Sequence, residues 1–543
     1  MLKKIVNDLN NIVSGEISTS KNTRDYYSTD CSVFQIEPKM VFYPRNKRDV
    51  TEMIRYLYDL ACEGNKLPLT VRGKGTDLSG AAIGNGVVMV MPTHMNRKIG
   101  LYKQTVRVQP GMAYKQLEQL LQHHQRFLPP YPSSIDFASV GGAVGNNTAG
   151  EKSMRYGVTK DYVKSLEVVL SNGQKVELGY LSKRQLKSKL DQNDFEGDIY
   201  RRIKELIETN QELLDKSRPD VSKNVAGYNL WDVMDKKGGM DMTKLIVGSQ
   251  GTLAVVTEIE FIHEPYQPDT ELIAVFCENI EQVDKLILAL GKYNPSSLEV
   301  VDHNLLEVLK QSHPRYIQGL VPEKFPELML LVEFDNKSKR YQRYYAKRAI
   351  KQIEKYGMEY RLAKNSDEAA DYWRIRHGAA AVLAMQDGRK KALPVIEDLV
   401  VPMDKMIEFI SKINKLFKKY NLKIAIWGHG GDANFHMQPY FDLGSKADRE
   451  QMLKFIDEVY RMVIKLGGST AGEHNDGLIR GKYLKELYGA RLYGVMKQVK
   501  DIFDPQGILN PYIKTGAENV KLDKLLRKSY DMSHLSDHMP QIL

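Results

Sequence analysis

The chain has 543 residues, of which 42% are hydrophobic and 27% charged, a composition typical of about two to four soluble globular domains. No segment approaches about 20 consecutive apolar residues, which excludes a spanning helix. Cys31, Cys62 and Cys277 lie too far apart for a disulfide framework, a cysteine zinc site or an iron–sulfur ligand run.

The first 18 residues interrupt their apolar positions with Asp and Asn, so we expect a short amphipathic helix rather than a signal peptide, and a cytoplasmic protein. The net charge of +10 raises nucleic-acid or membrane-surface binding as a class of function. The basic residues occur only in small groups, as in residues 183–189, which is typical of a solvated helix face. We therefore expect no nucleic-acid partner.

The first half of the chain predicts short strands that alternate with helices and glycine-rich loops. The predicted elements are a strand at 40–43, a helix carrying Val50, Ile54, Leu57 and Leu60, strands within 67–71, 86–91 and 105–110, a helix at 114–123, loops approaching a ligand at 140–157, a strand at 165–170, polar helices within 181–223, and strands around a glycine-rich turn at 245–262.

Residues 263–269 carry two prolines and resemble a linker, after which strands alternate with amphipathic helices near 280–292, 338–356, 403–420 and 447–466. The fold class is therefore α+β. We divide the chain into an N-terminal helical extension at 1–34, a first domain at 35–265, a second domain at 266–480, a segment at 481–515 that returns to the first domain, and a polar tail at 516–543.

The segment 71–88 contains five glycines, at positions 73, 75, 80, 84 and 86. Glycines let backbone N–H groups approach an anion closely, and successive N–H groups can form a phosphate-binding nest. The spacing matches neither a P-loop nor the Rossmann fingerprint. Taken alone, the segment is equally compatible with a glycine-rich surface loop.

Two histidines stand seven residues apart in the segment 423–439, with Gly430, Gly431 and Asp432 between them. On one straight strand His429 and His436 would point to opposite faces, but a hairpin that turns at residues 430–433 brings both to one site. A pair like this is by itself more often structural than metal-binding.

A second segment, 469–484, places Glu473 and His474 next to each other between glycines. Two imidazoles and one carboxylate match a catalytic zinc-type site with an open position, which would leave one group, His474, unligated.

Three further segments, 132–157, 248–261 and 504–512, follow the first glycine loop along the chain. Together the four resemble, in order and spacing, the flavin-binding segments of the vanillyl-alcohol-oxidase/PCMH family of FAD-linked oxidoreductases, and more narrowly those of its D-2-hydroxyacid dehydrogenase branch. The resemblance covers residues 25–515. It implies a PCMH-type FAD-binding domain plus an α+β substrate (cap) domain with an antiparallel sheet.

The resemblance also implies which residues hold FAD. Arg72, Gly73, Lys74, Gly75, Thr76, Asp77 and Ser79 would cradle the pyrophosphate; Gly141, Gly142, Asn147, Thr148 and Gly150 would line the flavin; and Gly248, Gly251, Thr252, Ile259 and Asn510 would contact the cofactor from later segments. As alternatives, Ile259 is plain core and Asn147 only caps a turn. Family members that bind FAD covalently usually carry a histidine in the first loop, where this chain has Thr76, so we predict dissociable FAD.

By the same resemblance, His429, His436 and Glu473 hold a divalent metal, with zinc favoured, and His474 is the base. Arg376 corresponds to the arginine that grips the substrate carboxylate, although a surface ion pair is an alternative for it and for its neighbour Arg374. The implied reaction is oxidation of a D-2-hydroxy acid of the D-lactate, glycolate or D-2-hydroxyglutarate type to the 2-oxo acid, with hydride transfer to flavin N5.

Two residues depart from the family pattern: Ala433 and Asn475 stand where glycine is common. Three cysteines are too few for the iron–sulfur domain that some members carry. We therefore expect a separate electron acceptor, namely an iron–sulfur subunit, an electron-transfer flavoprotein or a quinone, the last of which would bring the enzyme to the inner membrane surface. The rival hypotheses are a metal-dependent hydrolase without flavin and a basic binding module.

Overall fold

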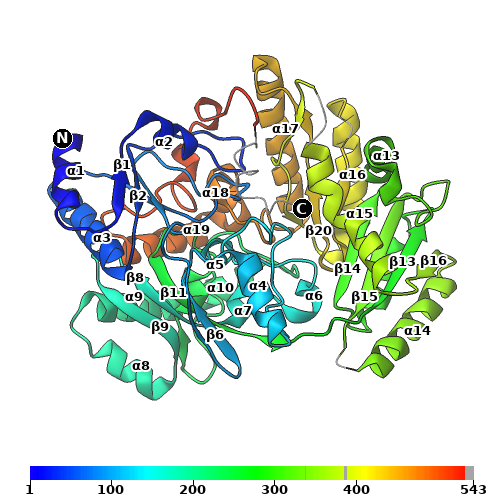
Figure 1. Cartoon of the computed structure of the whole chain (residues 1–543), viewed down its shortest axis with the longest axis horizontal. Coiled ribbons are helices and arrows are strands. Elements are labelled where there is room, and N and C mark those ends of the chain that lie inside the picture. The colour runs from blue at the N-terminus through cyan, green and yellow to red at the C-terminus, as the bar shows by residue number, and fades with distance from the viewer. Residues whose placement is uncertain (337, 385–387, 423, 532–543) are drawn as a thin grey trace.

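The computed structural model describes residues 1–336, 338–384, 388–422 and 424–531 (Figure 1). Two lobes lie side by side. The first lobe combines residues 1–265 with residues 484–513, and the second contains residues 271–465. The unit boundaries given above remain a prediction, and residues 532–543 of the proposed polar tail lie outside the described residues.

A four-stranded sheet forms one half of the first lobe, in the order β1-β2-β4-β3. Its strands are β1 (Glu16–Ser18), β2 (Met40–Tyr43), β4 (Val87–Val90) and β3 (Leu69–Arg72), the last three parallel to one another. Helices α1 (Leu2–Asn10) and α3 (Lys47–Cys62) share its apolar core, and α2 (Lys21–Tyr26) adjoins it. The N-terminal segment thus supplies an edge strand as well as helices.

An antiparallel six-stranded sheet forms the other half, in the order β10-β9-β8-β11-β6-β5. Its strands are β10 (Met240–Asp241), β9 (Lys175–Leu181), β8 (Val163–Val169), β11 (Val255–Ile262), β6 (Thr105–Val108) and β5 (Lys98–Leu101). It shares an apolar core with helices that include α4 (Tyr114–His123), α8 (Lys183–Leu190), α9 (Phe195–Thr209), α10 (Gln211–Ser217) and α19 (Leu484–Phe503). In the predicted linker, β12 (Glu264–Pro265) pairs with β7 (Arg126–Phe127) of the first lobe.

Two sequence predictions in this lobe are wrong. Residues predicted as loops form helices α5 (Val140–Asn146) and α6 (Ser153–Tyr156), and residues 245–246, at the start of a segment predicted to form strands, are the last two of α11 (Thr243–Ile246). The Ser139 side chain caps α5 by accepting a hydrogen bond from Gly142 N at 3.3 Å. A Cβ at Gly141 would lie 2.7 Å from the Pro110 carbonyl oxygen, so close packing, and not a loop, requires that glycine.

The second lobe contains a seven-stranded antiparallel sheet in the order β16-β13-β15-β14-β19-β20-β18, which confirms the predicted class of cap domain. The strands are β16 (Glu359–Leu362), β13 (Glu271–Cys277), β15 (Leu328–Phe334), β14 (Ser297–Asp302), β19 (Ile426–His429), β20 (Asn434–Met437) and β18 (Leu399–Val400). A two-stranded pair, β17 (Lys391–Ala392) with β21 (Tyr440–Phe441), lies beside it.

Alternate residues of β13 enter two different cores, one on each face of this sheet. Ile273 and Val275 pack with α12 (Val283–Gly291), α14 (Lys339–Lys355), α16 (Met406–Lys419) and α17 (Lys446–Lys465). Leu272 and Phe276 pack with α13 (His303–Ser312) and α15 (Ser366–Ala384). Helices on both faces explain why the strands are apolar throughout.

The chain returns to the first lobe after the sheet of the second, through α18 (Gly477–Arg480) and α19. Lys500 on α19 donates to the carbonyl oxygens of Thr252 and Leu509 at 2.7 and 2.6 Å. Beside Leu509, the backbone of Leu69 in β3 bonds to residues 508 and 510. The last described residues cross back to the N-terminal segment, where Leu526 pairs with Phe34.

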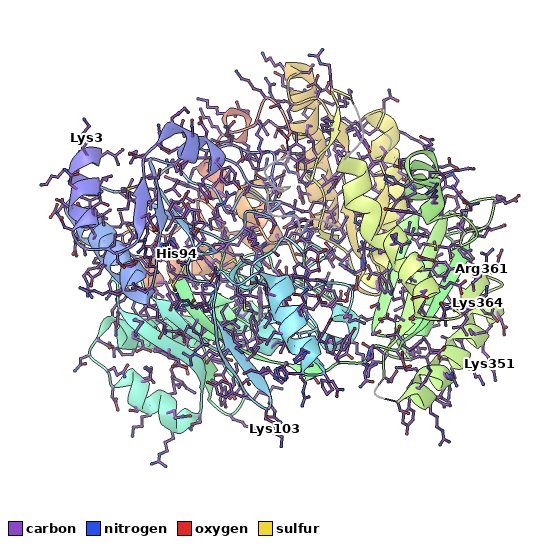
Figure 2. All side chains as sticks on the ribbon, viewed as in Figure 1. Lys3, His94, Lys103, Lys351, Arg361 and Lys364 are labelled. Carbon is purple, nitrogen blue, oxygen red and sulfur yellow. The ribbon has the colours of Figure 1, made fainter. Side chains whose placement is uncertain are left out.

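Charge is distributed over the whole surface. The lysines labelled in Figure 2 lie at the outline of the molecule on both lobes rather than on one face. Among the described helices, none combines the length and the apolar character that crossing a bilayer requires.

Candidate functional site

A cavity of about 630 Å³ joins the glycine-rich loops of the first lobe to the histidines of the second. Its wall includes segments of residues 71–82, 131–151 and 246–256 from the first lobe, and Trp427 and His429 from the second. The two groups of residues that the sequence singles out independently therefore face one space.

Ten of the predicted cofactor residues lie on the cavity wall: Gly73, Lys74, Gly75, Thr76, Asp77, Gly141, Gly142, Thr148, Gly150 and Gly251. Gly145 lies there as well, and a Cβ at this position would meet no atom within 4 Å. Several stretches of the wall thus lack side chains, which allows a ligand to approach the peptide groups there.

The other seven predicted residues, Arg72, Ser79, Asn147, Gly248, Thr252, Ile259 and Asn510, do not line the cavity as the described residues define it. Asn510 Nδ2 donates to the carbonyl oxygens of Ala81 and Gln250 at 3.0 and 2.8 Å, which ties two wall segments together. Ile259 is fully buried in β11, and Asn147 caps the C-terminal end of α5 with a left-handed φ of 55°. Of these three, Asn510 supports the wall from behind.

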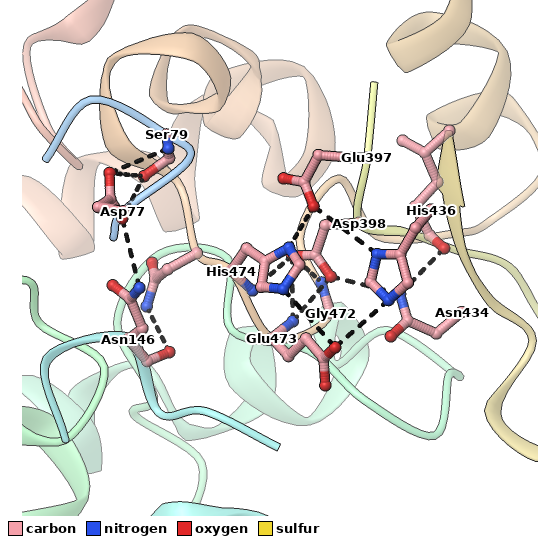
Figure 3. A network of polar contacts seen from close by, with 12 residues as sticks. Asp77, Ser79, Asn146, Glu397, Asp398, Asn434, His436, Gly472, Glu473 and His474 are labelled. Atoms are coloured by element: carbon pink, nitrogen blue, oxygen red, sulfur yellow. Dashed lines mark hydrogen bonds and ion pairs between the residues drawn. The ribbon is translucent and has the colours of Figure 1, made fainter. Parts of the chain in front are cut away.

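Further hydrogen bonds hold the first glycine loop in shape (Figure 3). Ser79 donates to Asp77 through both its N–H and its hydroxyl, and Asn146 Nδ2 donates to Asp77 Oδ1 at 3.3 Å. Arg72, buried below the loop, donates to the carbonyl oxygens of Thr29 and Ala82 at 2.8 and 3.2 Å. Asp77 therefore joins the loop after β3 to the end of α5.

The predicted histidine hairpin is confirmed. Strands β19 and β20 pair antiparallel, with Trp427 opposite His436, and the rings of His429 and His436 lie 5.3 Å apart between centroids. The turn between them contains Ala433 at a φ of 47°, a left-handed conformation that costs an alanine about 1–2 kcal/mol. This conformation is the physical reason why glycine is common at that position.

One carboxylate holds the segment that carries Glu473 and His474 (Figure 3). Asp398 accepts hydrogen bonds from three successive backbone N–H groups, those of Gly472, Glu473 and His474, at 2.9, 3.0 and 2.8 Å. Because the backbone bonds to Asp398, both side chains are directed toward the histidine hairpin.

The four predicted metal and base residues meet at one point. The nearest donor atoms of His429, His436 and Glu473 all lie within 4.8 Å of one another, and those of Glu397, His436 and His474 form a second such group. Glu473 Oε1 lies 2.8 Å from His429 Nε2 and 3.4 Å from His436 Nε2. The other ring nitrogen, His436 Nδ1, is buried without a hydrogen-bond partner among the described residues and lies 3.7 Å from Glu397 Oε2, in the second group. Two imidazoles and a carboxylate in this arrangement fit a divalent cation.

Buried carboxylates raise the pKa of two of the site histidines, His474 and His429. Although burial opposes it, the charge of Glu397 beside Nδ1 raises the pKa of His474 to about 9. Burial likewise opposes a charged His429, but Glu299 and Glu473 raise its pKa to about 9. His429 and Lys223 hold the pKa of Glu473 well below its usual range despite burial.

Arg376 lies on the cavity wall, where its Nε donates to Glu299 Oε2 at 2.8 Å. Glu299 Oε1 is 2.8 Å from His429 Nδ1, so one carboxylate orients both groups. The neighbouring Arg374, in contrast, forms a surface ion pair: it bonds to Asp371 at 2.6 Å and is half exposed.

The sequence interpretation missed Glu299, Glu397, Asp398, Lys223 and Arg480. Lys223 is buried between Glu473 and Asp432, at 3.2 and 3.3 Å, and Arg480 is buried against Glu397. The sequence does contain a pattern from which the three acidic residues could have been found. Glu299 interrupts the apolar strand SLEVVD, and Glu397 and Asp398 interrupt PVIEDLV, where unpaired charges would be costly.

Family models match both lobes. The model described as "FAD binding domain" matches residues 38–179, and the model described as "FAD linked oxidases, C-terminal domain" matches residues 267–513. The two lobes and the cavity between them are those of a FAD-dependent oxidoreductase. More particularly, the chain belongs to the FAD-linked oxidases, as the resemblance of the four segments predicts.

Relatives agree along nearly the whole chain. The glycolate oxidase subunit GlcD of Bacillus subtilis is 29% identical over 495 residues, which are 89% of this chain and 91% of the relative. The D-2-hydroxyglutarate dehydrogenase of Pseudomonas putida is 27% identical over 92% of this chain but only 50% of its own length. The chain thus spans about half the length of that relative.

Solved structures support the fold. Substrate-bound p-cresol methylhydroxylase superposes with a TM-score of 0.68 over 94% of this chain and 96% of that chain, at 13% identity. At this identity the likeness concerns the fold alone. It confirms the PCMH-type architecture, and the FAD-binding match argues against the flavin-free hydrolase.

We predict that Asp398→Ala lowers the free energy of unfolding by about 3–5 kcal/mol, because three buried N–H groups lose their acceptor. Urea unfolding measures the change. The control is Asp194→Ala, which removes an exposed acceptor for Gly197 N at the start of α9 and costs about 1 kcal/mol. Equal losses in the two variants would contradict the role given to Asp398.

Proposed function

We propose that the chain oxidises a D-2-hydroxy acid, of the D-lactate, glycolate or D-2-hydroxyglutarate type, to the 2-oxo acid. The cavity carries this proposal, because it joins the FAD-binding loops to a buried cluster of histidines and carboxylates. The names of the relatives support the same chemistry. FAD, when bound, supplies N5 as the acceptor of the hydride that leaves the substrate Cα.

His474 is the proposed base. Its Nδ1–H donates to Glu397, so in the neutral ring Nε2 is the atom left to take the hydroxyl proton of the substrate. Although burial opposes a charged ring, Glu397 raises the pKa of His474 to about 9, so the fraction of molecules with a neutral ring grows as the pH rises toward 9. Arg480, on the far side of Glu397, holds that carboxylate in place. Glu397 thus orients the imidazole and stabilises the charge that it acquires.

His429, His436 and Glu473 are the proposed ligands of a divalent metal, and we favour zinc. A metal there would act as a Lewis acid toward the substrate hydroxyl and carboxylate oxygens. The Nδ1–H of His429 donates to Glu299, an arrangement typical of metal-binding histidines. Since Arg376 Nε is engaged with Glu299, its terminal amino groups would bind the substrate carboxylate.

Electrons then pass to a separate acceptor, which we propose is an iron–sulfur subunit, an electron-transfer flavoprotein or a quinone. About half of the length of the two D-2-hydroxyglutarate dehydrogenases has no counterpart in this chain, so these relatives do not identify the acceptor. The proposal of a separate acceptor rests on the reaction, because the reduced flavin must be reoxidised. We further propose a cytoplasmic location, with peripheral contact with the inner membrane if the acceptor is a quinone.

The primary test is the visible spectrum of the purified protein, followed by anaerobic titration with D- and L-2-hydroxy acids. We expect flavin bands that one D-acid bleaches while its L-enantiomer does not. A protein that shows no flavin after reconstitution with FAD, or that no D-acid reduces, would refute the proposal.

We also predict that the flavin is not covalently attached, because Thr76 occupies the position of the usual histidine. Acid precipitation should therefore release all of the flavin into the supernatant. Yellow colour that stays with the denatured chain on a gel would be the contrary result.

Substitutions can distinguish the proposed roles of His474 and His429. His474→Ala should keep bound metal and FAD but reduce turnover by about 100-fold or more, as expected when a general base is removed. His429→Ala should lose both bound metal and turnover. Metal content by mass spectrometry and steady-state rates measure both, with exposed His124→Ala as the control. Full turnover in either site variant would remove that residue from the mechanism.

A further inference from the structure

Asn475 follows the Glu473–His474 pair directly and adopts a left-handed φ of 68°. Glycine takes this conformation without cost, and asparagine is among the few other residues that tolerate it. Asn475 is also completely buried, which a surface turn would not require. The departure from the family pattern therefore keeps the backbone conformation and adds a side chain.

That side chain joins the site to the cavity wall. Asn475 Nδ2 donates to the carbonyl oxygens of Asn146 and Gly248 at 3.0 and 2.9 Å. Asn146 ends α5 and lies on the wall, and Gly248 immediately precedes Ser249, which also lines it. Both amide hydrogens are used, each on a different segment of the first lobe.

The carbonyl oxygen of the same amide is equally occupied. Asn475 Oδ1 accepts from Asp476 N at 2.8 Å and from Lys514 Nζ at 2.6 Å. Lys514 is fully buried and also bonds to Asp476 Oδ2 at 2.8 Å and Gly227 O at 2.6 Å. With four bonds, the amide has no remaining capacity and only one orientation.

We propose that Asn475 is a positioning residue that fixes the Glu473–His474 segment against the cavity wall, with Lys514 holding its amide. The inference rests on the proposed function, in which His474 takes the substrate proton. Because Asn475 is adjacent to His474, a shift of its backbone moves the imidazole relative to the wall. Geometry errors of about 1 Å can reduce a rate about 100-fold.

The test compares Asn475→Gly with wild-type holoprotein. Glycine retains the left-handed backbone, so the variant should fold and bind FAD, but it lacks the amide that joins the segments. The matched control is Asn294→Gly, which makes the same change at an exposed left-handed asparagine of the second lobe, with a φ of 50°. Asn475→Asp is the conservative variant, since it keeps the acceptor for Lys514 and loses both donors.

Two quantities are measured: the rate of flavin reduction per bound flavin at saturating D-2-hydroxy acid, and amide hydrogen exchange of the holoprotein. We expect the rate to fall about tenfold or more in both Asn475 variants, with less than about a threefold change in half-saturating substrate. We also expect faster exchange at residues 145–148 and 247–251, which are distant from the mutation in sequence. Asn294→Gly should change neither quantity.

A loss of flavin or stability with an unchanged rate per remaining flavin would overturn the proposal, because a structural role alone has that effect. Unchanged exchange at both wall segments would overturn it as well. If no 2-hydroxy acid reduces the wild-type flavin, the proposed function fails, and the exchange measurement alone decides whether Asn475 joins these segments.

Discussion

The site depends on the carboxylate of Asp398, which accepts hydrogen bonds from three consecutive backbone N–H groups. Asp398 has a φ of 136°, unusual for a residue with a side chain, and burial raises its pKa. Both features cost stability, and the three hydrogen bonds offset them. The neighbouring Glu397 bonds to the His474 ring, so two adjacent acids fix the backbone and the imidazole of one residue.

Three buried glutamates in the site follow one pattern: each lies between a histidine and a permanent cation. The three sets are Glu299 with His429 and Arg376, Glu397 with His474 and Arg480, and Glu473 with His429 and Lys223. Burying so many charges contributes little to stability, since desolvation largely cancels the attraction. The effect of these charges is orientation, because the rings of His429 and His474 and the guanidinium groups of Arg376 and Arg480 each have a charged partner in a defined position.

Local patterns predicted much of this structure from the sequence. The strand at 40–43, the helix at 114–123 and the histidine hairpin agree with the structure, because short-range periodicity and turn residues determine them. The same rules failed for α5, where close packing and the Ser139 cap allow a glycine-rich helix. They also could not assign Asp398 to residues 472–474, because more than 70 residues separate the partners and no short motif records the contact.

The return of the chain to β3 has a consequence for biosynthesis. Asn510 ties together Ala81 and Gln250, and Leu509 lies beside Leu69, so the wall of the FAD cavity includes contacts that span more than 400 residues. During synthesis, the part of the first lobe up to β11 leaves the ribosome first. The rest of that lobe follows only after the whole second lobe has been synthesised. At about 5–20 residues per second this interval is on the order of ten to fifty seconds. The tie between Ala81 and Gln250 can therefore form only after the second lobe has been synthesised, because Asn510 follows that lobe in the chain.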